Sequence, residues 1–498
     1  MSDEADAPSA AGPPDEDRAA PPSLAPAPGA LRDMAGIAAD LSLDTHGVAA
    51  PLVVTGEYQA AALVHDPLPR TIRRVALPAV ASNLLMTLFG SVDAYWVGTR
   101  VGSAGLAAVS TSVFWIWGAI SLAELVSIGL TAVAARRHGE RRPDRAAEAV
   151  GQALVLALVF GVTVAAVGLL VLDDLFAMMH TPPEVTALGR RYLGAYLVGA
   201  PLIFAFFAVD AAFRAAGDTR TPFVLLASSV ALTLVLDPIL ILGLGPAPEL
   251  GVAGAGVATV LTRGAAGLLG LTILVRRRMI RFGSVELPTL RAIARIGLPA
   301  SATGVTFSLI YVVLTRTTTQ FGTPALAALG IGHRVESWLY MIGLGGGAAA
   351  AAIVGQNLGA GRADRAERAG WLAVAYTSVP GVAMCLAAAL VPEALASLFT
   401  DDPLVIAESA RYLRIGAIAQ LVLCAEIVLE GALGGAGDTV PPMLTSTALT
   451  LSRIPIAVWA ALHWGTDGIW WTISLTALAR GLAMMAIWRW GPWRRRSV

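Results

Sequence analysis

Long apolar segments, separated by short polar stretches, fill the chain from about residue 71 to residue 490. A helix needs roughly 20 apolar residues to cross a hydrocarbon core about 30 Å thick. We predict such helices over 72–97, 106–135, 149–172, 185–215, 222–244, 252–275, 290–320, 326–356, 370–391, 404–433, 442–463 and 468–490. The pattern therefore predicts an all-α polytopic membrane protein with twelve transmembrane helices.

An internal repeat divides these helices into two sets of six. The sequence Ala-Gly-Asp-Thr at 216–219, followed by Pro222, recurs at 436–439, followed by Pro442. Asp-Arg-Ala at 144–146 and 364–366, and Leu-Ala-Ala at 106–108 and 326–328, keep the same offset of 220 residues. Because each repeat holds an even number of helices, both repeats have the same orientation and form two parallel six-helix lobes. In each Gly-Asp-Thr turn, we expect the glycine to end one helix and the polar residues to cap the next.

The boundaries of four segments follow from this pattern. Residues 1–66 are rich in alanine and proline and begin with several acids, which predicts a disordered cytoplasmic tail. Residues 67–280 form the N-lobe and residues 281–490 form the C-lobe. Residues 491–498 form a basic cytoplasmic C-terminus.

Composition supports a membrane protein and removes several classes of function. Hydrophobic residues make up 56% of the chain and charged residues 14%, against about a quarter charged in soluble domains. The formal net charge is zero, so charge gives no reason to expect a nucleic-acid partner. All 35 basic residues are arginine, so a Walker A nucleotide site and a Schiff-base lysine are both excluded within this chain. The two cysteines fall in apolar runs, and we expect neither a disulfide nor a metal site.

Arginines cluster in alternate loops and at the C-terminus, for example at 136–145, 276–278 and 494–496. The intervening loops carry acids instead, at 173–174 and 401–402. Cytoplasmic loops of membrane proteins are enriched in arginine and lysine. We therefore expect both termini in the cytoplasm and the chain in the plasma (inner) membrane as a multi-pass protein.

Two acids inside apolar helices of the first half are candidate proton carriers. Asp93 and Asp237 would each cost about 2.5–3.5 kcal/mol to insert in the bilayer centre. A low-dielectric setting disfavours the charged carboxylate, which suits reversible proton uptake. The second half has Leu314 and Ala457 at the matching positions. The alternative reading is a carboxyl that hydrogen-bonds between helices and serves packing alone.

The second half carries other ionisable residues within its apolar helices. They are Glu336, Glu426, Glu430 and Arg453. Glu430 matches Asp210 at the offset of 220, which favours a structural or gating pair. An arginine in the membrane needs a carboxylate partner, and we expect Glu426 or Glu430 to pair with Arg453. We treat the four residues of the second half, together with Asp210, as one candidate gating or charge network.

Several motifs together resemble the multidrug and toxin extrusion (MATE) family of transporters. The matching features are Leu77-Pro78, Val92-Asp93, the two Gly-Asp-Thr turns, Leu236-Asp237-Pro238 and the segment 355–361. Their order, spacing and duplication cover about residues 71–490. The chain is most similar to the proton-coupled, DinF-like branch of that family.

This resemblance implies a secondary active antiporter that exports small, cationic and amphipathic organic compounds or drugs by alternating access. It implies that Asp93 and Asp237 couple export to protons, supported by Thr233 and by a bend at Pro78. Family members coupled to sodium carry acids in helices seven and ten, and the predicted helix seven here has none. We therefore expect H⁺ as the coupling ion, with Na⁺ as the alternative.

Other functions stay open at this stage. A flippase of a lipid-linked substrate shares the two-lobed plan, and an intramembrane enzyme is the alternative outside transport. The six histidines are scattered along the chain and form no metal or nucleophile pattern, so we expect no enzyme and no catalytic residue. We expect a monomer whose partners are a small organic substrate and the lipid bilayer, without cofactor, metal, nucleotide or nucleic acid.

Overall fold

A computed structural model of the chain describes residues 62–101, 103–179 and 182–496. Some side chains within these helices lie outside the description, and that of Asp93 is one of them. The predicted tail, residues 1–66, falls outside the described residues except for its last five. The predicted boundary between the two lobes stays a prediction.

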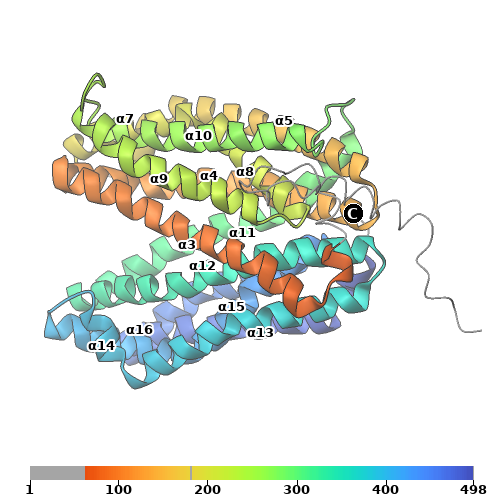
Figure 1. Cartoon of the computed structure of the whole chain (residues 1–498). Helices are drawn as coiled ribbons and strands as arrows, with labels where there is room; N and C mark the ends of the chain where they lie inside the picture. The colour runs from red at the N-terminus through yellow and green to blue at the C-terminus, as the bar shows by residue number, and fades with distance from the viewer. Residues whose placement is uncertain (1–61, 102, 180–181, 497–498) are drawn as a thin grey trace, which may run out of the picture. The chain divides into compact units, whose positions relative to one another are not determined.

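Eight described helices form the first half of the chain (Figure 1). They are α3 (Leu68–Arg100), α4 (Ser103–Gly139), α5 (Pro143–Leu170), α6 (Leu172–Met178), α7 (Pro183–Val198), α8 (Ala200–Ala215), α9 (Arg220–Leu242) and α10 (Val252–Arg276). Small and aromatic side chains from α4, α5 and α8 fill the core of this half, with Phe204 and Phe213 fully buried. Close packing of small residues is how helices associate in a medium as apolar as themselves.

The second half repeats this order of elements. It contains α11 (Leu287–Thr319), α12 (Thr323–Gly359), α13 (Ala363–Leu390), α14 (Pro392–Ser397), α15 (Pro403–Ala436), α16 (Val440–Trp490) and the short 3-10 helix η1 (Pro492–Arg495). The first residues of α4, α5, α6, α7 and α9 lie 220 residues before those of α12, α13, α14, α15 and α16. The sequence repeat is therefore also a structural repeat.

Six membrane spans can be assigned to each half. Eight described helices are long and apolar enough to cross a membrane, and the bent pair α7 and α8 forms a ninth span. One of the eight, α16, has 51 residues and contains two spans that meet at Gly465. The first helix of each half, α3 or α11, is less apolar but equally long, at 33 residues. The predicted twelve-helix architecture is confirmed.

The structure differs from the sequence prediction at one helix of the first half. We predicted an unbroken helix over 185–215, whereas α7 and α8 meet at Gly199 with a bend of 51°. Pro201 lies in the first turn of α8, where its missing N–H is tolerated. The matching stretch of α15 has no internal proline and is one continuous helix. Proline and glycine together explain the break.

The Gly-Asp-Thr turns have the predicted geometry. Gly217 and Gly437 are left-handed, with φ of 86° and 80°. Asp218 Oδ1 accepts the backbone N–H of Thr221 at 3.0 Å, and its Oδ2 accepts Arg277 Nη1 at 2.8 Å. The second turn repeats the ion pair between its own aspartate and an arginine after the last span. The first turn caps α9 as expected from the sequence. In the second turn Pro441 replaces the residue that donates to the aspartate, so among the described bonds Asp438 pairs with Arg496 at 3.0 Å and does not cap α16.

The two halves meet through α3 and α4 on one side and α11 and α12 on the other. We call the end of the bundle where α4, α12 and α16 end the terminal side. There, a methyl group on Gly139 would overlap the carbonyl oxygen of Gln356, and one on Gly359 would overlap that of Arg136. Gln356 also donates from Nε2 to the carbonyl of Ala215 at 2.7 Å. The halves are thus in backbone contact on the terminal side.

The described residues begin before the predicted lobe boundary. Residues 62–65, which we assigned to the disordered tail, are helical, and Leu63 and Val64 are buried. Burial of these apolar side chains offsets the entropy cost of ordering them. In Figure 1 the red segment at the start of the described residues lies among the teal and blue helices of the second half.

Candidate functional site

Asp237, one of the two predicted coupling acids, lies in α9 and is 0% exposed. Asp93 belongs to α3 by its backbone, and its side chain lies outside the described residues. The burial expected for Asp237 is therefore present. The joint role of the two carboxyls in coupling stays a prediction.

Buried hydroxyl groups between α9 and α10 form hydrogen bonds one helical turn from Asp237. Thr233, one turn before Asp237 on the same helix face, donates to the carbonyl of Ser229 at 3.0 Å. Its hydroxyl lies 2.9 Å from that of Thr262, which in turn donates to the carbonyl of Thr259 at 3.3 Å. Buried hydroxyls that bond to one another and to the backbone can rearrange around a group that gains or loses a proton.

A buried arginine also lies in this half. Arg263 follows Thr262 on α10, is 5% exposed, and lies with Nη2 3.6 Å from the sulfur of Met86 on α3. Its permanent positive charge shares the interior of the first half with the buried acid. Our sequence reasoning did not single it out, although a lone arginine within the apolar run 252–275 was a visible signal.

Pro78, where we expected a bend, lies inside α3, which is helical from Leu68 to Arg100. Ser82 donates from Oγ to the carbonyl of Pro78 at 2.9 Å, a local bond that often accompanies bending. Two residues after the proline, Val80 packs against Gly345 of α12. A change of bend at Pro78 would therefore change the contact between the halves.

In the second half, Glu426 of α15 forms an ion pair with Arg480 of α16 at 3.2 Å. Their side chains are 7% and 9% exposed. Arg453 donates from Nε to Thr476 Oγ1 at 2.6 Å, and Arg480 donates to Thr450 Oγ1 at 3.0 Å. We expected Arg453 to pair with Glu426 or Glu430; among the described ion pairs, Glu426 pairs with Arg480 instead.

Glu336 of α12 is held by side chains from α15. Tyr412 and Gln420 both donate to its Oε1, at 3.0 and 3.3 Å. Its Oε2 lies 3.5 Å from Nδ1 of His333, one turn earlier on α12. This carboxylate therefore already has several polar neighbours, which suits a structural or gating role.

Asp210 of α8 and its repeat counterpart Glu430 of α15 occupy related positions. Asp210 forms an ion pair with Arg214, whose guanidinium donates to Ser127 of α4 at 3.2 Å. Glu124, also on α4, lies within electrostatic range of Arg214 in the first half and of Glu430 in the second. We did not single out Glu124 from the sequence, although it is an ionisable residue within the apolar run 106–135.

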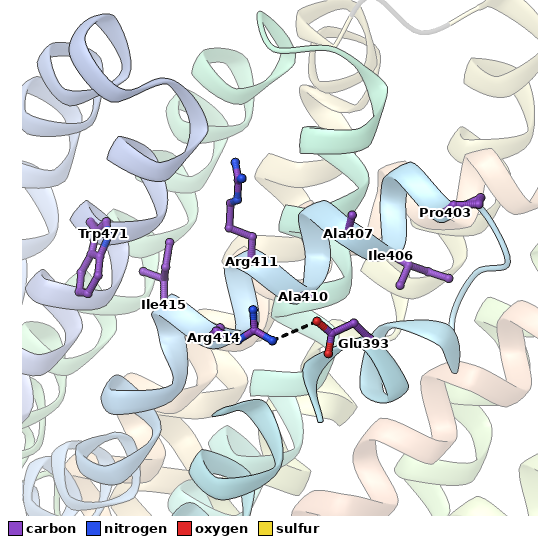
Figure 2. Close-up of a pocket in the computed structure, with 9 residues that line it drawn as sticks. All are labelled: Glu393, Pro403, Ile406, Ala407, Ala410, Arg411, Arg414, Ile415 and Trp471. Atoms are coloured by element: carbon purple, nitrogen blue, oxygen red, sulfur yellow. Dashed lines mark hydrogen bonds and ion pairs between the residues drawn. The ribbon is translucent and has the colours of Figure 1, made fainter. Parts of the chain in front are cut away.

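A cavity of about 670 Å³ opens on the side opposite the terminal side, between α14, α15 and α16 (Figure 2). Arg414 donates to Glu393 across it at 3.0 Å, and Trp471 lies at its far edge. None of its lining residues is a predicted coupling or gating residue. This cavity is distinct from the candidate coupling site.

The two six-helix repeats are in backbone contact on the terminal side, and each has ionisable groups in its interior. These features define a duplicated membrane transporter. The chain belongs to the MatE family, the multidrug and toxin extrusion transporters. The family model matches residues 78–239 and 299–459, one stretch in each repeat.

Similar proteins support this assignment over most of the chain. A relative from Thermotoga maritima, described as a probable multidrug resistance protein NorM, is 30% identical over 443 residues, covering 85% of this chain and 93% of the relative. An FAD transporter from Shewanella oneidensis is 26% identical over 427 residues, covering 84% and 94%.

Solved MATE structures share the fold. A crystal structure of MATE in the straight conformation matches with a TM-score of 0.80 and 24% identity, over 86% of this chain and 97% of that chain. A bent conformation matches equally well, with a TM-score of 0.80 over 86% and 96%. The prediction of a MATE transporter is confirmed, while the DinF-like branch stays a prediction.

Proposed function

We propose that the protein exports small, cationic and amphipathic organic compounds in exchange for protons, by alternating access between its halves. The observation that carries the proposal is the buried carboxyl of Asp237, one helical turn from Thr233, whose hydroxyl lies 2.9 Å from that of Thr262. A carboxyl in such a place binds and releases a proton with little other rearrangement. Asp93 would be its partner acid on α3.

The second half supports protons over sodium. A sodium site needs several oxygen ligands that face one another. Glu426 is occupied by Arg480, and Glu336 already accepts from Tyr412 and Gln420. Sodium coupling remains the alternative and is one arm of the test below.

We further propose that the terminal side faces the cytoplasm of the plasma membrane, with both termini inside. Most of the arginine clusters lie on that side, which agrees with the positive-inside rule. Contact between the halves there, at Gly139 and Gly359, corresponds to a state closed to the cytoplasm. The transporter would work as a monomer, without cofactor or metal.

The names of relatives support the substrate class. Besides the Thermotoga protein, a Staphylococcus aureus relative is described as the multidrug export protein MepA and is 22% identical over 434 residues. The Shewanella relative makes FAD a second substrate to test. Buried arginines such as Arg263 and Arg453 would suit a larger anion of that kind.

The test uses purified protein in liposomes with imposed pH or Na⁺ gradients. We expect uptake of ethidium to follow the pH gradient, to be lost in D237N, and to persist in D174N, an exposed acid on α6. Proton-driven transport in well-folded D237N would contradict the coupling role. Transport driven by Na⁺ alone, or of FAD or a fluorescent lipid in place of ethidium, would replace the proposal with the corresponding alternative.

A further inference from the structure

Residues 62–66, which precede the first helix of the first half, are bound to the second half. Asn357 Nδ2 donates to the carbonyl of Leu63 at 3.3 Å, and Arg362 Nη1 donates to that of Val64 at 2.9 Å. Arg365 donates to the carbonyl of Asp66. These donors stand at the end of α12 and the start of α13. The segment that precedes the first helix of the first repeat is thus hydrogen-bonded to the second repeat.

Leu63 also touches the first half. Its side chain is 0% exposed and belongs to a core cluster built mainly from α12, α13 and α15. A methyl group on Gly217, in the first Gly-Asp-Thr turn, would stand 2.7 Å from Leu63 Cδ1. One leucine side chain therefore fills a gap between the second half and a turn of the first half on the terminal side.

The repeat shows what this segment corresponds to. The connection between the halves, residues 277–286, lies on the first half, where Arg281 N–H donates to the carbonyl of Ala147 at 3.0 Å. Glu286 pairs with Arg145 at 2.6 Å. At an offset of 220, Glu286 matches Asp66, and Arg145 matches Arg365. Residues 62–66 therefore occupy on the second half the place that the connection occupies on the first.

The two segments differ in how they are held. Residues 277–286 are joined covalently to α10 and α11, so they stay with both halves in every state. Residues 62–66 are held on the second half by hydrogen bonds and by the burial of Leu63, and they lead into the start of α3, where Ile72 and Val75 are buried in the same core cluster. Separation of the halves on the terminal side must break these contacts or pull Leu63 away from Gly217.

We propose that residues 62–66 form a releasable clasp that holds the terminal side closed and detaches when that side opens. The inference rests on the alternating access in the proposed function, but it does not need proton coupling. Loss of the burial of one leucine changes an equilibrium constant roughly tenfold or more. Weakening the clasp should therefore raise the population that is open on the terminal side by about that factor.

The test measures distances between spin labels in the full-length protein in lipid nanodiscs. Labels replace Asp144 and Asp364, which are exposed and lie at matching positions of the two halves, in a background where both native cysteines are alanine. We expect L63A and R365Q each to enrich the long-distance population about tenfold. The controls are L154A, a buried leucine within the first half, and R495Q, an exposed arginine on the terminal side.

Each result has one meaning. A shift in both clasp variants and in neither control supports the clasp. Unchanged distributions in L63A and R365Q, with a wild type whose distance still responds to acid pH or ethidium, overturn the clasp and leave alternating access standing. A distance that no condition changes overturns both. Controls that shift as much as the clasp variants would show a general loosening and overturn the clasp alone.

Discussion

Gly139 of α4 lies so close to Gln356 of α12 that a methyl group in place of its hydrogen would overlap the carbonyl oxygen of Gln356. The repeat copies this relationship, because Gly359 stands against Arg136 in the same way. Two glycines 220 residues apart thus allow the two halves to approach to backbone contact. Glycine is required at this crossing because any side chain would separate the helices.

We predict that G139A weakens the closed state of the terminal side. An added methyl group at a tight helix crossing costs about 1–3 kcal/mol. Ethidium export by the variant in liposomes should fall, and the label distance between Asp144 and Asp364 should increase. The matched control is G118A in the same helix, where the new methyl group meets no atom within 4 Å. Equal behaviour of the two variants would contradict the role of the crossing.

We predict that the Glu426–Arg480 ion pair is required for stability as a pair. E426Q leaves the buried guanidinium without its carboxylate partner, at a cost of about 3 kcal/mol or more. Thermal unfolding of the purified protein should show a lower Tm for E426Q and for R480Q, and the double variant should recover part of the loss.

These single and double variants form a double-mutant cycle, and a second cycle with Glu426 and Arg453 serves as its comparison. We expect a larger coupling energy between Glu426 and Arg480, which lie 3.2 Å apart, than between Glu426 and Arg453, whose described bonds go to Thr476 and to a backbone carbonyl. The reverse order would show that our original pairing of Arg453 with Glu426 was correct.

We predict that T233V slows proton-driven export several-fold while the protein stays folded. Valine keeps the shape of threonine but removes the hydroxyl that lies 2.9 Å from Thr262, one turn from Asp237. A lost hydrogen bond is worth about 0.5–1.5 kcal/mol, which sets the expected size of the effect. Initial rates at several pH values test it, with T272V on the exposed face of α10 as control.

Glu286 gives a prediction about pH. The hydroxyl of Thr289, which donates to Glu286 at 3.0 Å, and then the guanidinium of Arg145 hold the pKa of Glu286 below its usual range. A lowered pKa in the folded state contributes stability that is present above the usual pKa and is lost as pH falls through the lowered one. E286Q should therefore lower the Tm at neutral pH and leave it unchanged at strongly acid pH. An equal loss of Tm at both pH values would contradict this.

The helices could be predicted because the surrounding lipid dictates their pattern. Each span needs a long apolar segment, so the sequence defined all twelve. The break at Gly199 was missed because 185–215 is apolar throughout, and only the nearby Pro201 signalled it. The kink at Gly465 lies in the short polar stretch that we had predicted between two helices.

Partners of buried charges were harder to predict than the charges themselves. Glu426 and Arg453 stood out as ionisable residues in apolar runs, but their contacts depend on how α15 and the two parts of α16 rotate against one another. Arg453 and Arg480 lie in the two different spans of α16, on either side of Gly465, and the sequence does not show which of them faces Glu426. The repeat does not show which buried charges are in contact, because these charged residues have no charged counterparts in the first half.

The packing of residues 62–66 on the second half was also not predictable from the sequence pattern. Leu63 and Val64 lie in a stretch too short to read as a span, and their binding surface is made by α12 and α13, nearly 300 residues later. The match of Asp66 with Glu286 at the repeat offset, which we did not use in the sequence analysis, was a signal for them. Contacts between distant segments are visible in a sequence only where the sequence duplicates them.

The cavity beside Arg414 and Trp471 has a practical consequence for inhibitor discovery. It has room for a drug-sized molecule, and it lies away from every residue that we assign to coupling or gating. A compound recovered there in a crystal soak or a thermal-shift screen would report on a peripheral pocket, even if it binds tightly. Hits therefore need to be ranked by competition with a transported dye. We expect R414A to weaken the binding of compounds in this cavity and to leave the binding of competitors of the dye unchanged.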